Sequence, residues 1–261
     1  MADTAKCLPF FYRCFMKNKN NIKVLLVIMM VCCMIFATSC SKNEKQSEST
    51  LPTQQPVQQT EPTSSPDIYW QPFVSQKVYD AYNENEDVAG WLTVTGCEID
   101  NRVFQSTDND YYLRLNENGE YDVWGCYFLD YINVNDGYTL PDKVSIIYGH
   151  ALDDNPNSEK FSKLKRFKNS EFALQNSTIT FNLLYDTTEW EIFAVCDIPI
   201  TIDYIDPNPD EEKYTDTLEH MQKNSYVDFG VDITTDDQIL VLSTCTSNEN
   251  IRFVVAAKII E

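Results

Sequence analysis

The segment DQILVLSTCTSNENIRFVVAAKII, residues 237–260, contains two runs rich in Val, Ile and Leu, separated by a short polar stretch. Runs of this composition favour β-strands, and two strands joined by a short loop form an antiparallel hairpin. Cys245 ends the first run and Arg252 opens the second. In a hairpin these two positions lie at the same end of the sheet. The sequence therefore predicts that a thiol and a guanidinium lie close together.

One of the two histidines of the chain, His150, ends another strand-like run, KVSIIYGH at residues 143–150. Gly149 lets this strand finish without bulk, so that the imidazole stands at the rim of the sheet. If both strand ends point the same way, His150, Cys245 and Arg252 meet at one rim. A nearby cation favours the thiolate, which is the nucleophilic form of cysteine. The alternatives are a packing role for the thiol and a structural role for the imidazole.

Together these three residue types are suited to acyl transfer through a thioester. His150 would act as general acid and base, and the permanent charge and forked donors of Arg252 would hold a developing oxyanion. We expect no metal and no cofactor. Two distant histidines, no Cys-x-x-Cys after residue 40 and no EF-hand pattern argue against zinc and calcium sites.

The remaining strand-like runs indicate a fold that is mainly β. They are GWLTV, VWGCYFLD, STITFNLL and EWEIFAVCDI. Including the three runs described above, the chain has seven or more short strands and few helices, which points to a barrel or a sandwich.

Three helices are expected among these strands. The first two cover residues 75–83 and residues 158–168, where apolar side chains recur on one side. The third begins with Asn208 as N-cap and Glu211 as its capping-box partner. Its buried side is expected to consist of Tyr214, Leu218 and Met221. His220 falls off that side, and we expect it to be exposed and without function.

The first forty residues have the pattern of a targeting segment. Residues 24–37, VLLVIMMVCCMIFA, form an uncharged apolar run of 14 residues after three lysines. A permanent membrane span needs about 20 apolar residues, so this run suits the apolar part of an export signal. Two small residues before Cys40 resemble a bacterial lipobox, which makes Cys40 a candidate lipidation site. A lipoprotein leader and an uncleaved anchor both remain open, and both place the rest of the chain outside the cell.

Residues 41–66 are rich in Ser, Thr, Gln and Pro, which predicts a disordered stalk before a folded domain at residues 67–261. Residues 41–261 contain 15 basic and 39 acidic residues, a formal charge of −24. So acidic a surface repels phosphate backbones, and we expect no nucleic-acid partner.

Seven segments resemble, in the same order, those of class B sortases, the cysteine transpeptidases of Gram-positive bacteria. They are EDVAGWLTVTGCEID, DNDYYLR, GCYFLDY, IIYGH, KFSKLKRF, DQILVLSTC and IRFVVAAKII. The likeness runs from about Tyr79 to the C-terminus, and it includes Leu-x-Thr-Cys with an arginine seven residues later. The resemblance implies an eight-stranded β-barrel with an N-terminal helix and a further helix packed before the last strands.

The resemblance also implies a role for each site residue. Cys245 is expected to attack the Thr carbonyl of a C-terminal sorting motif, with His150 as general acid/base and Arg252 steadying substrate and oxyanion. Ser243 and Thr244 are expected to line the substrate pocket. The acyl group would pass to an amine of a peptidoglycan cross-bridge or of a pilin lysine. The enzyme would act on the extracellular face of the cytoplasmic membrane, anchored by its N-terminal segment or by lipid.

Some positions depart from the sortase pattern. Ala151 follows the histidine where Asn is common, and TCTSNEN lacks the aromatic residue often found soon after the cysteine. Cys97 and Cys126 stand where Thr or Ser is usual. A disulfide between them and two separate small thiols are both compatible with an extracellular domain. Cys196 is expected to be a core thiol.

Two other functions compete with transpeptidation. A thiol peptidase of the same fold would hydrolyse its substrate and ignore an added amine, whereas a transpeptidase would form a new amide. A non-catalytic, stalked surface binding module is disfavoured because all three reactive residues are present.

Overall fold

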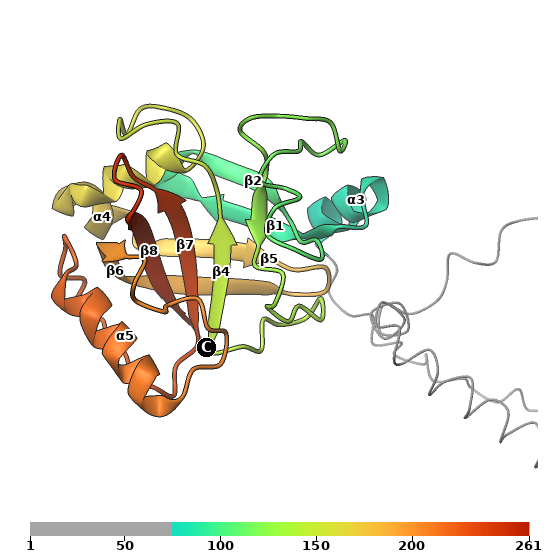
Figure 1. Cartoon of the computed structure of the whole chain (residues 1–261). Coiled ribbons are helices and arrows are strands. Elements are labelled where there is room, and N and C mark those ends of the chain that lie inside the picture. The colour runs from blue at the N-terminus through green and yellow to red at the C-terminus, as the bar shows by residue number, and fades with distance from the viewer. Residues whose placement is uncertain (1–74, 261) are drawn as a thin grey trace, which may run out of the picture. The chain divides into compact units, whose positions relative to one another are not determined.

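The structure is a computed structural model that describes residues 75–260. Eight strands form a closed barrel in the order β1-β2-β3-β4-β7-β8-β6-β5 (Figure 1). This confirms the eight-stranded barrel that the resemblance to sortases implies, and it excludes the sandwich that the strand pattern also allowed. The apolar run, Cys40 and the stalk lie outside the described residues. Between residues 75 and 260, no helix has the length and apolar character that crossing a membrane requires.

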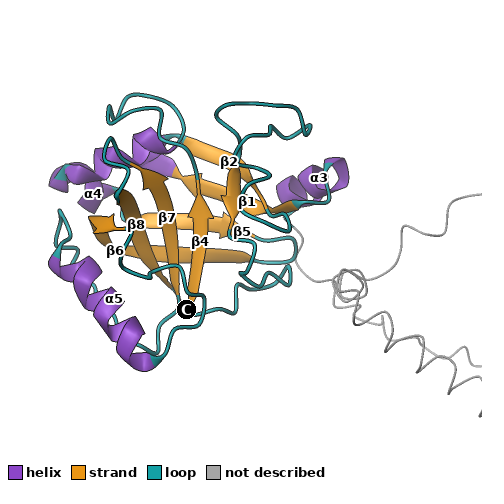
Figure 2. Ribbon diagram, viewed as in Figure 1, coloured by secondary structure: helices purple, strands orange, loops and turns teal. Residues whose placement is uncertain are grey.

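The strands and helices follow the chain in a simple order. The strands are β1 (Val88–Val94), β2 (Ile99–Phe104), β3 (Tyr127–Leu129), β4 (Val144–Tyr148), β5 (Thr178–Asn182), β6 (Thr187–Pro199), β7 (Ile239–Cys245) and β8 (Ile251–Ile259). The α-helices are α3 (Gln76–Glu84), α4 (Ser170–Gln175) and α5 (Glu211–Lys223), and the 3-10 helices are η2 (Thr95–Cys97) and η3 (Phe161–Lys168). Figure 2 shows the α-helices outside the barrel wall.

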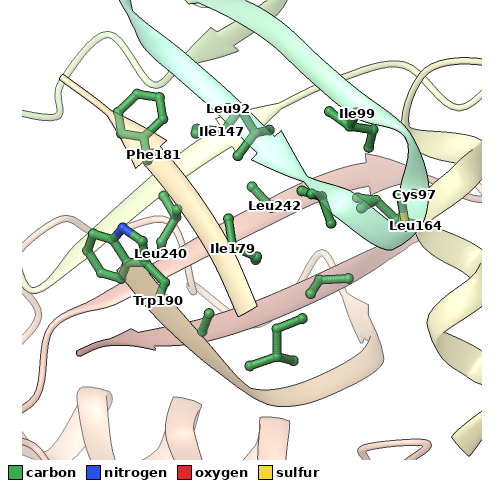
Figure 3. Close-up of a cluster of buried hydrophobic side chains, with 14 of the residues drawn as sticks. Leu92, Cys97, Ile99, Ile147, Leu164, Ile179, Phe181, Trp190, Leu240 and Leu242 are labelled. Atoms are coloured by element: carbon green, nitrogen blue, oxygen red, sulfur yellow. The ribbon is translucent and has the colours of Figure 1, made fainter. Parts of the chain in front are cut away.

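Alternating side chains give each strand an inner and an outer face. Along β7, Leu240 and Leu242 belong to the cluster inside the barrel, whereas Ile239 and Val241 belong to a second cluster on its outer face. Figure 3 shows the inner cluster, with Leu92, Phe181, Trp190, Leu240 and Leu242 among its members. By the same alternation, Cys245 at the end of β7 lies on the outer face.

Helix α5 covers the outer cluster and confirms the predicted helix, although its first turn differs. The buried residues of the predicted stripe are Tyr214, Leu218 and Met221. Asp210, not Asn208, is the N-cap, because its carboxylate accepts a hydrogen bond of 2.9 Å from the amide of Lys213. Asn208 instead donates its side-chain amide to Asp142 at 2.8 Å. Glu211 is the first residue of the helix, so the predicted capping box was wrong.

His220 on α5 is half-buried, which corrects the prediction that it is exposed. Ile202 and Asp203, from the loop before the helix, line the same surface pocket as His220. This neighbouring loop explains the burial. Within residues 75–260 the buried Nε2 atom of His220 has no hydrogen-bond partner.

The predicted helix at residues 158–168 is the 3-10 helix η3. Its apolar residues Phe161, Leu164 and Phe167 are all buried and are spaced by three positions. A 3-10 helix has three residues per turn, so this spacing places all three side chains on one side. Helix α3 begins and ends within one residue of the first predicted helix.

β2 and α4 have no counterpart among the predicted elements. In β2, Asp100 and Asn101 are exposed and interrupt the apolar pattern. The segment is a strand because it pairs along its whole length with β1, which shows that tertiary context outweighs composition here. α4 has only six residues, too few to display a helical period.

Candidate active site

The ends of β4 and β7 determine where His150 and Cys245 lie. The two strands are parallel neighbours, and their last pair is Tyr148 with Ser243. His150 and Cys245 each follow this pair by two residues, so they come at the same level of the barrel. Figure 1 shows the β4 and β7 arrows pointing the same way. The two strand ends therefore share one rim, which meets the condition that the sequence left open.

The hairpin of β7 and β8 adds Arg252 to this rim. Cys245 and Arg252 are directly paired across the antiparallel strands. Side chains of such a pair project from the same face, with Cβ atoms about 5 Å apart. The predicted neighbourhood of thiol and guanidinium is confirmed.

All three side chains line one pocket of about 270 Å³. The other lining residues are Asn109, Leu113, Phe128, Tyr148, Gly149, Ser243 and Thr244. Cys245 is exposed, so its sulfur is accessible to a peptide lying in this pocket. The pocket opens on the outer face of the barrel and does not enter the apolar interior.

Ser243 and Thr244 line the pocket, and both side chains are buried and bonded within the protein. The hydroxyls of Ser243 and Tyr204 share a hydrogen bond of 2.8 Å. Thr244 donates its hydroxyl to the carbonyl of Gly149 at 2.6 Å. The second bond ties the end of β7 to the residue before His150. These hydroxyls therefore hold the shape of the pocket.

No residue larger than glycine fits at position 149. A Cβ atom on this residue would lie 2.6 Å from the ring of Tyr127 and 2.7 Å from the ring of Phe161. On its other side, His150 accepts a backbone hydrogen bond of 2.9 Å from Phe161. The chain thus passes close to two aromatic rings at the point where the imidazole begins, and only glycine fits.

Arg252 supplies positive charge near two tyrosines, Tyr148 of the pocket lining and Tyr204. Burial raises the pKa of both Tyr148 and Tyr204, and the charge of Arg252 partly opposes that rise. One terminal nitrogen of the guanidinium, Nη1, donates to the carbonyls of Glu249 at 2.8 Å and Ile251 at 3.2 Å. These bonds fix the guanidinium at the rim. Its Nε and Nη2 atoms make no hydrogen bond within residues 75–260.

The candidate disulfide is not formed, because Cys97 and Cys126 are both free thiols. The Cys97 thiol points into the inner cluster and donates to the carbonyl of Lys163 at 3.3 Å. Burial raises the pKa of Cys97 to about 12 and that of Cys126 to about 11. Cys196 is a buried core thiol as predicted, and burial raises its pKa to about 12.

Pattern analysis of the sequence did not identify the pocket residues Asn109 and Leu113. Both belong to the loop at residues 105–126 between β2 and β3, which has no regular period. The loop reaches the site because β3 and β4 are neighbours in the barrel. Only the resemblance of DNDYYLR to sortases pointed to this segment. Over the described part of the chain, no group of three or more His, Cys, Asp or Glu residues is placed to hold a metal ion.

Comparison with known proteins gives consistent results. No family model matches the chain. Sortase B of Listeria monocytogenes is 32% identical over 191 residues, which cover 72% of this chain and 75% of the relative. Sortase B of Staphylococcus aureus is 28% identical over 181 residues, covering 68% and 72% respectively.

Solved structures show the same likeness. A complex of S. aureus sortase B with substrate has a TM-score of 0.65 at 27% identity, covering 72% of this chain and 87% of that one. Sortase B of Clostridium perfringens has a TM-score of 0.62 at 32% identity, covering 70% and 99%.

A closed eight-stranded barrel that carries a cysteine, a histidine and an arginine around one rim pocket defines a sortase-type cysteine transpeptidase. With the identity and coverage given above, the chain belongs to the sortase B family.

Proposed function

We propose that Cys245 is the nucleophile of this transpeptidase and that its substrate is a C-terminal sorting motif. The thiolate attacks the carbonyl carbon of the motif's Thr residue. The peptide C–N bond breaks, His150 gives a proton to the leaving amine, and the acyl group stays on sulfur as a thioester. The shared level of the β4 and β7 ends, which brings imidazole and thiol to one pocket, supports this assignment most strongly.

The second half of the proposed reaction transfers the acyl group to an amine. The incoming amine attacks the thioester carbonyl, His150 takes up its proton, and Cys245 is released. The acceptor is an amine of a peptidoglycan cross-bridge or of a pilin lysine. Related sortase B structures include one with substrate and one with triglycine, which supports peptide and amine partners for this chain.

Arg252 is proposed to hold the carbonyl oxygen as it becomes an oxyanion in both halves. The pairing of Arg252 with Cys245 across the hairpin, and the presence of both residues in the lining of one pocket, support this role. Hydrogen-bond donors that are already positioned where negative charge develops lower the activation free energy by several kcal/mol. A single donor in a well-studied protease contributes about 2.7–4 kcal/mol.

We propose that the enzyme works at the extracellular face of the cytoplasmic membrane of a Gram-positive bacterium. The apolar run at residues 24–37, with lysines before it, supports export and attachment. Cys40 is the proposed lipid site if the leader is cleaved. Mass spectrometry of the N-terminus extracted from membranes tests this, because a free, unmodified N-terminal leader would exclude lipidation.

The test of the proposed reaction is a peptide-library cleavage screen with and without triglycine. Cys245→Ala is expected to abolish cleavage, His150→Ala to lower it by about 10²–10⁴-fold and Arg252→Ala by about 10²–10³-fold. His220→Gln, which changes the other histidine of the chain on α5, outside the pocket lining, is the matched control and should retain activity. Full activity of Cys245→Ala would exclude the proposed nucleophile.

The same screen separates transfer from hydrolysis. With triglycine, a transpeptidase gives a new amide product, and turnover rises where aminolysis limits the rate. If only the hydrolysed acid forms at every amine concentration, the chain is a thiol peptidase instead.

A further inference from the structure

We propose that the loop at residues 105–126 is the element that orients His150. In this arrangement Nε2 of the imidazole carries a proton and donates it to the carbonyl of Leu113. Nδ1 then faces the reacting groups and exchanges the proton with the amines. The inference rests on the acid/base role of His150 proposed above, and it assigns a positioning function to a loop outside the catalytic residues.

Two groups of this loop reach the same ring nitrogen. The Leu113 carbonyl oxygen lies 2.9 Å from Nε2 of His150, and Nη1 of Arg114 lies 3.2 Å from it. The two contacts require opposite states of Nε2. A carbonyl accepts only if Nε2 carries a hydrogen, whereas a guanidinium donates only if Nε2 has a free lone pair.

The geometry favours the carbonyl. Its distance is the shorter of the two, and Nη1 of Arg114 also donates to the carbonyl of Val123 at 2.8 Å. That bond joins the two arms of the loop and uses one of the two N–H groups of Nη1. Within residues 75–260, Nδ1 of His150 makes no hydrogen bond, so its lone pair is available for an incoming amine.

This choice of tautomer suits a group that must both give and accept a proton. The imidazolium donates to Leu113 through Nε2 and gives the Nδ1 proton to the leaving amine. The neutral ring keeps its bond to Leu113 and takes the next proton at Nδ1. The imidazole therefore keeps one fixed partner through both half-reactions, as a histidine base does when a second group fixes its tautomer.

Gly125 allows the backbone to pass close to the Leu113 carbonyl. It has a left-handed φ of +49°, and a Cβ atom there would lie 2.3 Å from the carbonyl oxygen of Tyr112 and 2.7 Å from that of Leu113. Next to it, Cys126 donates its backbone N–H to Tyr112 at 3.0 Å. The two arms of the loop approach this closely only with glycine at residue 125.

The side chain of Trp124, from the same loop, also contacts the imidazole of His150. Its ring meets the imidazole of His150 edge to face, with centroids 6.5 Å apart and planes at 78°. Carbonyl, guanidinium and indole all come from residues 113–124 of one loop. This loop thus provides three contacts of the imidazole, with Leu113, Arg114 and Trp124, none of which belongs to β4.

The direct test is ¹⁵N NMR of the full-length protein labelled at histidine. The chain has two histidines, so His220→Gln leaves His150 as the sole signal. We expect the neutral ring to show a protonated Nε2 and an unprotonated Nδ1. The reverse tautomer, with Arg114 donating to Nε2, would overturn the inference. This measurement needs no substrate and does not depend on whether the proposed reaction occurs.

A pair of glycine variants tests the effect on catalysis. Gly125→Ala pushes on the Leu113 carbonyl, whereas Gly119→Ala in the same loop has an equally left-handed φ of +74° and only a 3.6 Å contact with the Tyr111 hydroxyl. We expect Gly125→Ala to lower kcat by about 10²-fold with little change in KM, and Gly119→Ala to keep the wild-type kcat. Equal kcat for both variants would overturn the inference. If Gly125→Ala does not fold, the NMR result decides.

Loss of activity in His150→Ala distinguishes the two proposals. If that variant stays active, the acid/base role fails whatever the tautomer. If it is inactive but the neutral ring carries its proton on Nδ1, the acid/base role stands and only the orienting role of Leu113 fails.

Discussion

Glycine at residue 149 is required by space and not by backbone conformation. The rings of Tyr127 and Phe161 stack with centroids 4.6 Å apart, and the chain crosses beside both immediately before His150. The aromatic pair lies under the strand end and leaves no volume for a methyl group. The identity of one residue thus fixes the path of the backbone into the site.

Gly149→Ala is expected to lower the free energy of unfolding by about 1–3 kcal/mol, as overpacking of a filled core does. The added methyl must move the rings or displace His150, so kcat should fall as well. Urea denaturation measures the first effect and the cleavage assay the second. Phe161→Leu in the same chain makes room, and the double variant should lose less stability than the sum of the two single changes. Strict additivity would contradict this steric explanation.

Among the four cysteines of residues 75–260, solvent exposure distinguishes Cys245 from the other three. Burial raises the pKa of Cys97, Cys126 and Cys196, which keeps these thiols protonated near neutral pH. Cys245 is exposed at the end of a strand. The sequence could not provide this distinction, because solvent exposure depends on which face of the barrel each residue occupies.

At the scale of elements, one carboxylate links the loop after His150 to the loop after Cys245. Asp154 accepts a hydrogen bond of 3.2 Å from the backbone N–H of Ser247. Its other oxygen pairs with Nζ of Lys165 on η3 at 2.5 Å, and the Lys165 side chain is only 4% exposed. These bonds to Lys165 and Ser247 hold the pKa of Asp154 at about 2.

This link predicts a pH-dependent contribution to stability. A carboxyl group whose pKa is lower in the folded state stabilises the fold above its ordinary value of 3.8, and this stabilisation is lost as pH falls toward 2. The Tm difference between wild type and Asp154→Asn should therefore be constant from about pH 7 to 5 and shrink between about pH 4 and 2. Because the Asp154 side chain is 48% exposed, solvent screening keeps the difference small.

Asp216→Asn, which changes an exposed carboxylate on α5, is the matched control and should show no such convergence. A Tm difference for Asp154→Asn that stays constant down to pH 2 would contradict the proposed link.

Elements whose apolar residues recur at a regular spacing were predictable from the sequence. Features that depend on individual hydrogen bonds or on pairing with another strand were not. The β7–β8 hairpin and the stripe of α5 are visible as apolar periodicity. The cap of α5 was misassigned because Asn208 and Asp210 are both good N-caps, and only the competing bond of Asn208 to Asp142 decides between them. β2 was missed because its exposed polar centre carries no strand pattern.

At the scale of the whole molecule, the site depends on a pairing that no local pattern contains. The hairpin brings Arg252 to Cys245 over a few residues, but the bond from Thr244 to Gly149 joins positions 95 residues apart. Without the resemblance to sortases, the sequence predicted only that three strand ends would meet if their directions agreed. The closed barrel supplies that agreement by placing β4 beside β7.

The free cysteines also show the limit of prediction from sequence. Spacing and compartment allowed a disulfide between Cys97 and Cys126, but the fold directs Cys97 into the barrel interior. The direction of a side chain in the short η2 turn between two strands depends on barrel geometry, which the composition of the segment does not encode.

The central claim is that Cys245 carries the acyl group between the two half-reactions. Full-length protein mixed with a peptide selected by the library screen and quenched in acid should gain the mass of the acyl fragment. Peptide mapping should place this mass on Cys245, and triglycine should remove it with release of a new amide. His150→Ala should show little of the adduct. Active enzyme that carries no adduct on Cys245, or carries it on another residue, would contradict the account.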